Sequence, residues 1–140
     1  MADPLVPSTG LGVLHLFCRV TADTDRARVE AAVKAAESDG LQVVPVAVLG
    51  HKADVALMVL GRDVWRLRSF QTAVAAAGLT VVDSYVSLTE LSEYAQGLPE
   101  AMAQARLYPQ LPPEGKPAWC FYPMSKRREV GANWYTQTYE

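Results

Sequence analysis

The order of apolar and amphipathic segments is the feature that most constrains the fold of this chain. Four short runs are rich in β-branched and aromatic residues, which is typical of strands, and they occupy residues 12–20, 41–50, 53–61 and 79–88. Amphipathic stretches with helical spacing follow the first and the third run. The predicted order is therefore strand, helix, strand, strand, helix, strand.

This order defines an α+β fold class, the ferredoxin-like or split βαβ unit, in which one antiparallel sheet carries both helices on one face. Thr21 or Asp23 can cap the first helix, which ends at Gly40, while Asp63 can cap the second, which ends near Gly78. The apolar faces of the helices comprise Val29, Ala32, Val33 and Ala36 in the first, and Leu67, Phe70 or Gln71, and Val74 in the second.

Pro45 lies inside the second predicted strand and cannot donate a hydrogen bond to a neighbouring strand, so we expect an edge or bulge position there. His51 and Lys52 form a short turn between the second and third strands, which predicts an antiparallel pair. Apolar residues on both sheet faces would leave the helix-free face exposed. We therefore expect a second unit or a partner subunit to cover it.

The remaining residues change in character after the first unit. We predict a ferredoxin-like repeat at 1–90, a connector rich in polar residues, proline and glycine at 91–117, and the start of a second repeat at 118–140. A strand is expected at 118–126, where an aromatic run ends in basic residues.

The overall composition excludes several classes of partner. With 140 residues and a net charge of −2, the chain is long enough for one compact domain but has no basic field for nucleic acid. No apolar run approaches the roughly 20 residues needed to span a bilayer, and the first ten residues do not resemble a secretory signal. Cys18 and Cys120 are far apart in sequence, and we expect both to be inert in a reducing, cytoplasmic compartment.

A candidate site appears in the predicted strand at 118–126. Because side chains alternate along a strand, Cys120, Tyr122, Met124 and Lys126 share one side of it. A phenol, a thioether and an ammonium group in line suit a flat, acidic, aromatic ligand. From the residues alone, a packed ring beside a solvated basic rim is the commoner explanation of such a string.

The string CFYPMSKRR at 120–128, followed by NWY at 133–135, resembles the signature of the coproheme decarboxylases in the chlorite dismutase superfamily. YVSLTELSEYA at 85–95 and ARLYPQLPP at 105–113 are similar to segments of the same family, in the same order. The resemblance covers about residues 80 to 140.

The resemblance implies a dimeric α+β barrel of two ferredoxin-like repeats, haem held by the second repeat, and assembly into a homopentamer. It also implies a reaction in which hydrogen peroxide and bound iron coproporphyrin III (coproheme) remove carbon dioxide from two propionates and give haem b. The porphyrin substrate then acts as its own redox cofactor.

The resemblance also implies residue roles. Tyr122 matches the tyrosine that becomes a radical and takes a hydrogen atom from the propionate, and Lys126 matches a lysine beside that propionate. Met124 matches a residue of the pocket wall, whereas Tyr94 and Arg106 match residues that bind propionates.

The chain departs from the family pattern in the residue that binds the haem iron. The proximal histidine of the family follows the NWY motif, at a distance that lies past Glu140, so we assign no metal ligand here. His15 and His51 are isolated and are expected to have structural or surface roles. Alternative functions on the same fold are a chlorite dismutase, a haem-free monooxygenase, or a non-catalytic porphyrin-binding or assembly subunit. The YPMSK string favours the decarboxylase over the other two enzymes.

Overall fold

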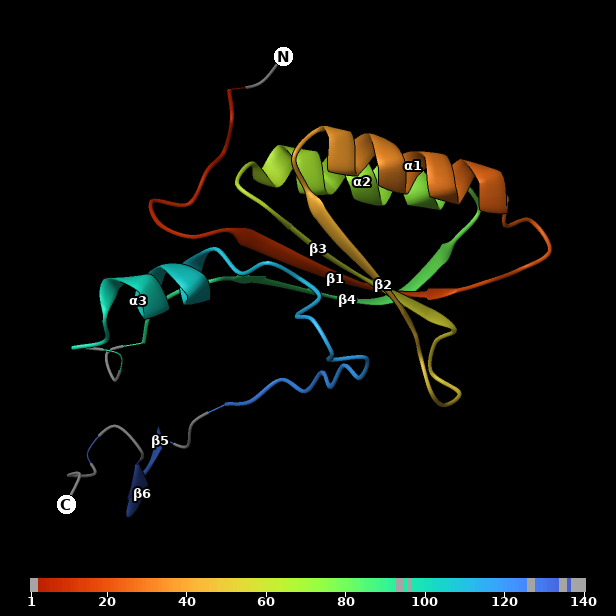
Figure 1. The fold of residues 1–140 in the computed structure, drawn as a ribbon. Coiled ribbons are helices and arrows are strands. Elements are labelled where there is room, and N and C mark those ends of the chain that lie inside the picture. Colours follow the sequence, from red (N-terminus) through yellow and green to blue (C-terminus); the bar gives the residue numbers. More distant parts are fainter. Residues whose placement is uncertain (1–2, 93–94, 96, 126–127, 134–135, 137–140) are drawn as a thin grey trace.

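The fold of residues 3–92, 95, 97–125, 128–133 and 136 is described by a computed structural model (Figure 1). The first unit consists of β1 (Gly12–Arg19), α1 (Arg26–Ser38), β2 (Gln42–Ala47), β3 (Val55–Gly61), α2 (Val64–Ala76) and β4 (Thr80–Leu88). It is followed by α3 (Glu100–Leu107) and by a small hairpin of β5 (Arg128–Glu129) and β6 (Ala132–Asn133).

The first unit is a ferredoxin-like βαββαβ arrangement, as predicted. Its strands form one antiparallel sheet in the order β2-β3-β1-β4, and α1 and α2 both lie on one face of that sheet (Figure 1). Strand β2 is an edge strand and contains Pro45, which confirms the position that the missing donor predicted.

The helix ends follow the predicted signals with one correction. Asp63 caps α2, and its side chain accepts a hydrogen bond from the Trp65 N–H at 3.0 Å. Helix α1 is capped by Asp25, not by Thr21 or Asp23, because the Thr24 hydroxyl accepts from the Thr21 N–H and closes a turn before the helix begins. Both helices end before glycines with positive φ, Gly40 and Gly78.

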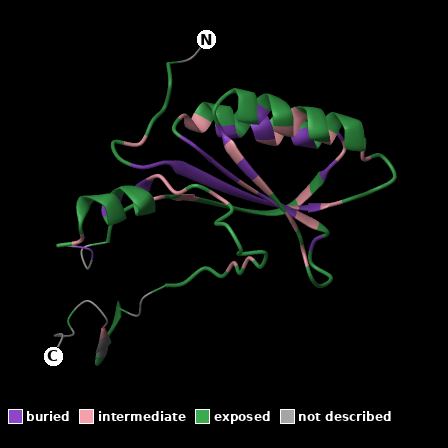
Figure 2. Ribbon diagram, in the orientation of Figure 1, coloured by how far each residue is buried: buried purple, intermediate pink, exposed green. Residues whose placement is uncertain are grey.

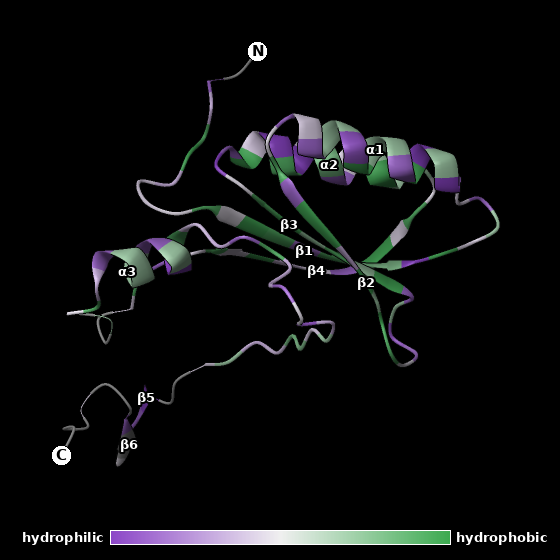
Figure 3. Cartoon of the chain, in the orientation of Figure 1, coloured by the Kyte–Doolittle hydropathy of each residue, from purple (hydrophilic) through white to green (hydrophobic). Residues whose placement is uncertain are grey.

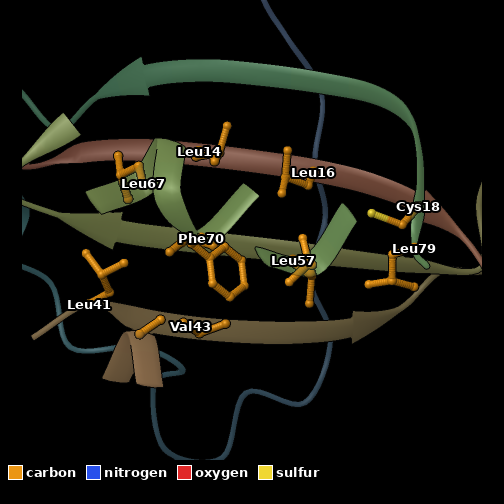
Figure 4. Close-up of a cluster of buried hydrophobic side chains, with 12 residues drawn as sticks. Leu14, Leu16, Cys18, Leu41, Val43, Leu57, Leu67, Phe70 and Leu79 are labelled. Carbon is orange, nitrogen blue, oxygen red and sulfur yellow. The ribbon is translucent and has the colours of Figure 1, made fainter. Parts of the chain in front are cut away.

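The main core lies between the helices and the sheet (Figure 4). Leu16 and Cys18 of β1 have no exposed surface, and Phe70 of α2 is buried over the same strands. Figure 2 shows burial concentrated in β1, β3 and the inner side of the helices, and Figure 3 shows the apolar residues at the same places. Burying these side chains is the main stabilising contribution of the unit.

The helix-free face of the sheet is partly covered by the same chain. Tyr108 and Leu111 of the connector pack against a second buried cluster of Leu11, Val13 and Leu60. This cover arises because the connector turns back under the sheet after α3, as the ribbon in Figure 1 shows. Further cover by a second unit or a partner subunit stays a prediction.

No strand forms at 118–125, contrary to the strand predicted at 118–126, and Lys126 lies outside the described residues. Strand hydrogen bonds need an adjacent strand. Residues 118–125 cross the sheet face by side-chain contacts instead of joining the sheet at an edge. The division of the chain near 90 and 117 stays a prediction.

Candidate functional site

The connector is fixed to the sheet edge by one side chain. The Gln42 Nε2 donates to the Pro109 carbonyl at 2.8 Å, and its Oε1 accepts from the Leu111 N–H at 2.9 Å. A single amide thus bonds to a donor and an acceptor of a segment more than sixty residues away in sequence. This contact determines where the chain turns after α3.

The carboxyl end of α3 is held to the start of β1. The Thr89 hydroxyl donates to the Leu107 carbonyl at 2.7 Å and accepts from the Leu11 N–H at 2.8 Å. Gly10 is required beside it, because its φ is +75° and a Cβ there would lie 2.4 Å from the Thr89 carbonyl oxygen. The route of the connector is therefore set at both ends by hydrogen bonds.

The segment bearing the candidate site crosses the helix-free face on aromatic rings. Trp119 stacks on His15, with ring centroids 5.8 Å apart and planes inclined by 16°. Phe121 lies 4.7 Å from His15, 5.2 Å from Phe17 and 5.6 Å from Tyr85. We call these five residues the ring cluster. Such pairs are each worth about 0.5–1.5 kcal/mol beyond the area that they bury.

Burial alternates from Ala118 to Tyr122 in this segment. Trp119 and Phe121 are half-buried, whereas Cys120, Tyr122 and Met124 are exposed, with 68% of Tyr122 and 81% of Met124 accessible. Because no strand forms here and Pro123 and Ser125 are exposed as well, the shared side of Cys120, Tyr122 and Met124 stays a prediction. Two further candidates, Tyr94 and Lys126, lie outside the described residues.

The structure does not bring Arg106 to this row of side chains. Arg106 is exposed in the last turn of α3, and within the described ranges no hydrogen bond or ion pair joins it to Tyr122 or Met124. His15, Phe17 and Tyr85, on which the segment packs, were not among the residues that the sequence patterns singled out. The signal was available, because alternation in β1 places His15 and Phe17 opposite Leu14 and Leu16.

Two cavities flank the ring cluster on the helix-free face. One, of about 690 Å³, is bounded by Phe17, Tyr85 and Phe121 and by the turn that carries His51 and Lys52. The other, of about 720 Å³, lies on the far side of Trp119, between Met58 and the prolines of the connector. Both fall in the size range of small-molecule sites and have mainly apolar walls.

Burial shifts the pKa values of Cys18 and His15 in the first unit. Burial raises the pKa of the Cys18 thiol to about 11, which keeps it protonated and unreactive, as expected. Cys120, expected to be equally inert, is exposed instead. Burial lowers the pKa of His15, and a hydrogen bond with the Tyr85 backbone opposes this effect.

His15 is thus enclosed by rings, and His51 is exposed on the turn between β2 and β3. In the described parts of the chain, no three histidine, cysteine or carboxylate side chains gather closely enough to hold a metal ion. Every helix within those ranges is too short or too polar to traverse a lipid bilayer.

Comparison with known proteins identifies the same family as the motif. The chlorite dismutase family model matches residues 23–140. The coproheme decarboxylase of Staphylococcus carnosus is 39% identical over 103 residues, which cover 66% of this chain and 41% of that protein. A protein of Haloarcula marismortui, named as heme-binding, is 36% identical over 122 residues, covering 74% of this chain and 18% of that protein.

A solved structure from Thermus thermophilus, described as that of a novel heme-binding protein, superposes with a TM-score of 0.70 at 25% identity. It covers 97% of this chain and 64% of the other. The chain therefore spans less than two thirds of each of these relatives. Because the family model extends over most of the sequence and the fold agrees, this chain belongs to the chlorite dismutase family.

Proposed function

We propose that this chain is the amino-terminal part of an enzyme that decarboxylates coproheme, with Tyr122 as the residue that takes a hydrogen atom from the propionate. The observation that carries the proposal is the Tyr122 phenol, which is 68% exposed on a segment that the ring cluster fixes to the first unit. A reacting phenol needs both access to substrate and a defined position.

The relatives support a porphyrin as the substrate. Two of them are named or described as heme-binding and one as a coproheme decarboxylase, and the motif CFYPMSKRR matches the signature of the latter group. Since the chain spans 41% of the decarboxylase, the iron ligand and the rest of the porphyrin pocket would come from sequence beyond this region or from a partner. His15 is too enclosed to reach a porphyrin iron.

In the proposed reaction hydrogen peroxide accepts the electrons that the propionate loses and becomes water. A radical at the Tyr122 oxygen takes a hydrogen atom, and with it one electron, from the propionate β-carbon. The substrate radical then gives up a second electron as the bond to its carboxylate breaks, so that carbon dioxide leaves and the vinyl group forms; one peroxide accepts the two electrons and two protons and becomes two water molecules. The porphyrin iron supplies the redox chemistry when it is bound. This chain supplies the phenol and the side chains that hold the substrate.

The other roles are proposed on the resemblance. Lys126 and Arg106 supply positive charge for propionates, Tyr94 supplies a hydroxyl, and Met124 forms an apolar wall next to Tyr122. Met124 is 81% exposed, which leaves it free to contact a ligand that approaches from outside the first unit. We also propose a homopentamer in the cytoplasm.

The test uses a haem-ligating form, which is this chain alone if coproheme titration shows binding, or otherwise the chain extended to the length of its relatives. We expect Tyr122→Phe to bind coproheme like the parent but to stop propionate loss on peroxide addition, because the substitution removes only the reacting hydroxyl. The products are followed by mass spectrometry of the porphyrin.

The matched control is Tyr85→Phe, which removes a hydroxyl from the sheet while keeping the ring that contacts Phe121. It should retain most of the activity. Formation of haem b by Tyr122→Phe at the parent rate would show that the assigned mechanism is wrong.

A further inference from the structure

His15 occupies an unusual place for a titratable residue. It lies on the interior strand β1, points to the helix-free face, and is only 8% exposed. Its ring is enclosed by Trp119 at 5.8 Å, Phe121 at 4.7 Å and Tyr85 at 6.5 Å. The imidazole therefore forms the centre of the contact between the sheet and the segment that carries Tyr122.

The enclosure of this ring favours its neutral form. The ring is bonded to the backbone of Tyr85, but its Nδ1 is buried and has no hydrogen-bond partner in the part of the chain that the structure describes. A neutral imidazole leaves Nδ1 as an unpaired acceptor or N–H, whereas an imidazolium must carry N–H groups on both nitrogens. In this enclosure the charged form would be both desolvated and incompletely bonded.

Few charges face His15 from the elements around it. Directly across the sheet from it are Met58 of β3 and Tyr85 of β4. Asp83, the carboxylate of β4, lies opposite Phe17, and its Oδ1 accepts from the Ser84 N–H at 2.8 Å. Arg19 of β1 is paired with Asp54, and the described residues 112–125 contribute Glu114, Lys116, Cys120 and Tyr122, all of which are exposed.

We propose that His15 is a pH-sensitive positioning residue: its neutral ring holds Trp119 and Phe121 on the sheet, and its protonation releases the segment that bears Tyr122. In the bound state Trp119 and Phe121 cover the His15 imidazole, and in the released state they do not. Rings that leave the sheet expose His15 to water, where both of its N–H groups find acceptors.

The direction of the pH effect follows from the burial of His15. Burial lowers its pKa below the ordinary value of 6.5, so the released state binds a proton more readily than the bound state. Attachment is complete above pH 6.5 and weakens as the pH falls from there toward the lowered pKa. In that window each pH unit changes the equilibrium by up to about tenfold.

The consequence for catalysis rests on the proposed function, whereas the attachment itself does not. If Tyr122 is the reacting group, acid would misplace it and lower the turnover rate while the first unit stays folded. The experiment below uses the chain without porphyrin, so failure of the decarboxylase proposal would leave its outcome unaffected.

The experiment follows Trp119 as the only tryptophan, in the chain with Trp65→Phe and Trp134→Phe. Quenching by neutral acrylamide and the emission maximum are recorded from pH 8 to pH 5, with far-ultraviolet circular dichroism as the measure of folding. We expect the quenching constant to rise at least twofold and the emission to shift to the red below pH 6.5, with unchanged circular dichroism. An imidazolium that only quenched Trp119 in place would reduce intensity without increasing access to acrylamide, which would overturn the proposal.

Two substitutions in the same background complete the test. His15→Phe keeps a ring but cannot be protonated, so Trp119 should stay protected down to pH 5. His51→Phe, which changes the exposed histidine of the β2–β3 turn, should respond like the parent. A transition that persists in His15→Phe, or one that is lost in His51→Phe, would contradict the role of His15.

Discussion

The first unit and the segment that crosses it are held by different interactions. Residues 12–88 have a sheet of four strands and a buried core between that sheet and two helices. Residues 108–123 contain no strand, and they are attached by Gln42, by the packing of Tyr108 and Leu111, and by the ring cluster. One region is stabilised by many cooperative contacts and the other by a few side chains.

Because of this difference, the stability of the first unit and the position of the segment depend on different side chains. Loss of one contact within the core affects the whole unit, because its elements unfold together. Loss of one anchor of the segment can release the segment locally and leave the unit folded. Substitution of a single anchoring side chain can therefore change the position of a site on the segment while the first unit stays folded.

The two cysteines give the largest expected contrast between the regions. An aromatic disulfide reagent at pH 8 should modify exposed Cys120 quickly and Cys18 at least roughly a thousandfold more slowly, because Cys18 becomes accessible only on unfolding. The raised pKa of Cys18, about 11, reduces its thiolate fraction further. The variant Cys120→Ser should show the slow phase alone, and similar rates for both thiols in the parent would contradict the described packing.

A core substitution should affect the whole first unit. Leu16→Ala should lower the free energy of unfolding by about 2–5 kcal/mol, because it leaves a cavity in a position with no exposed surface. The measurement is the urea midpoint followed by circular dichroism. Leu49→Ala, at a fully exposed position, should change it by less than about 0.5 kcal/mol. Equal effects of the two substitutions would mean that the core is misplaced.

An anchor substitution should have the smallest and most local effect. Gln42→Ala removes both hydrogen bonds to the connector, each worth about 0.5–1.5 kcal/mol. Hydrogen exchange of the Leu111 amide should accelerate roughly tenfold or more, while amides of β1 and β3 keep their protection. Gln110→Ala, which changes an exposed neighbour in the same connector, should leave Leu111 unchanged. Acceleration across the whole sheet would show that the two regions are not independent.

Much of the first unit could be predicted from local patterns. The spacing of Leu67, Phe70 and Val74, the cap at Asp63 and the edge position of Pro45 all agree with the structure. Each of these depends on residues within a few positions of one another, where periodicity and backbone geometry are decisive. The cap of α1 was placed two to four residues early because several adjacent side chains could serve.

The motif segment shows what local patterns could not supply. The sequence by itself determined the alternation that separates Trp119 and Phe121 from Cys120 and Tyr122, and the motif that identified the family. Only the tertiary structure decided that this segment crosses the helix-free face without forming a strand, and that His15 lies beneath it. Those contacts join residues about a hundred positions apart, and no periodicity within either segment specifies the ring on which the other will pack.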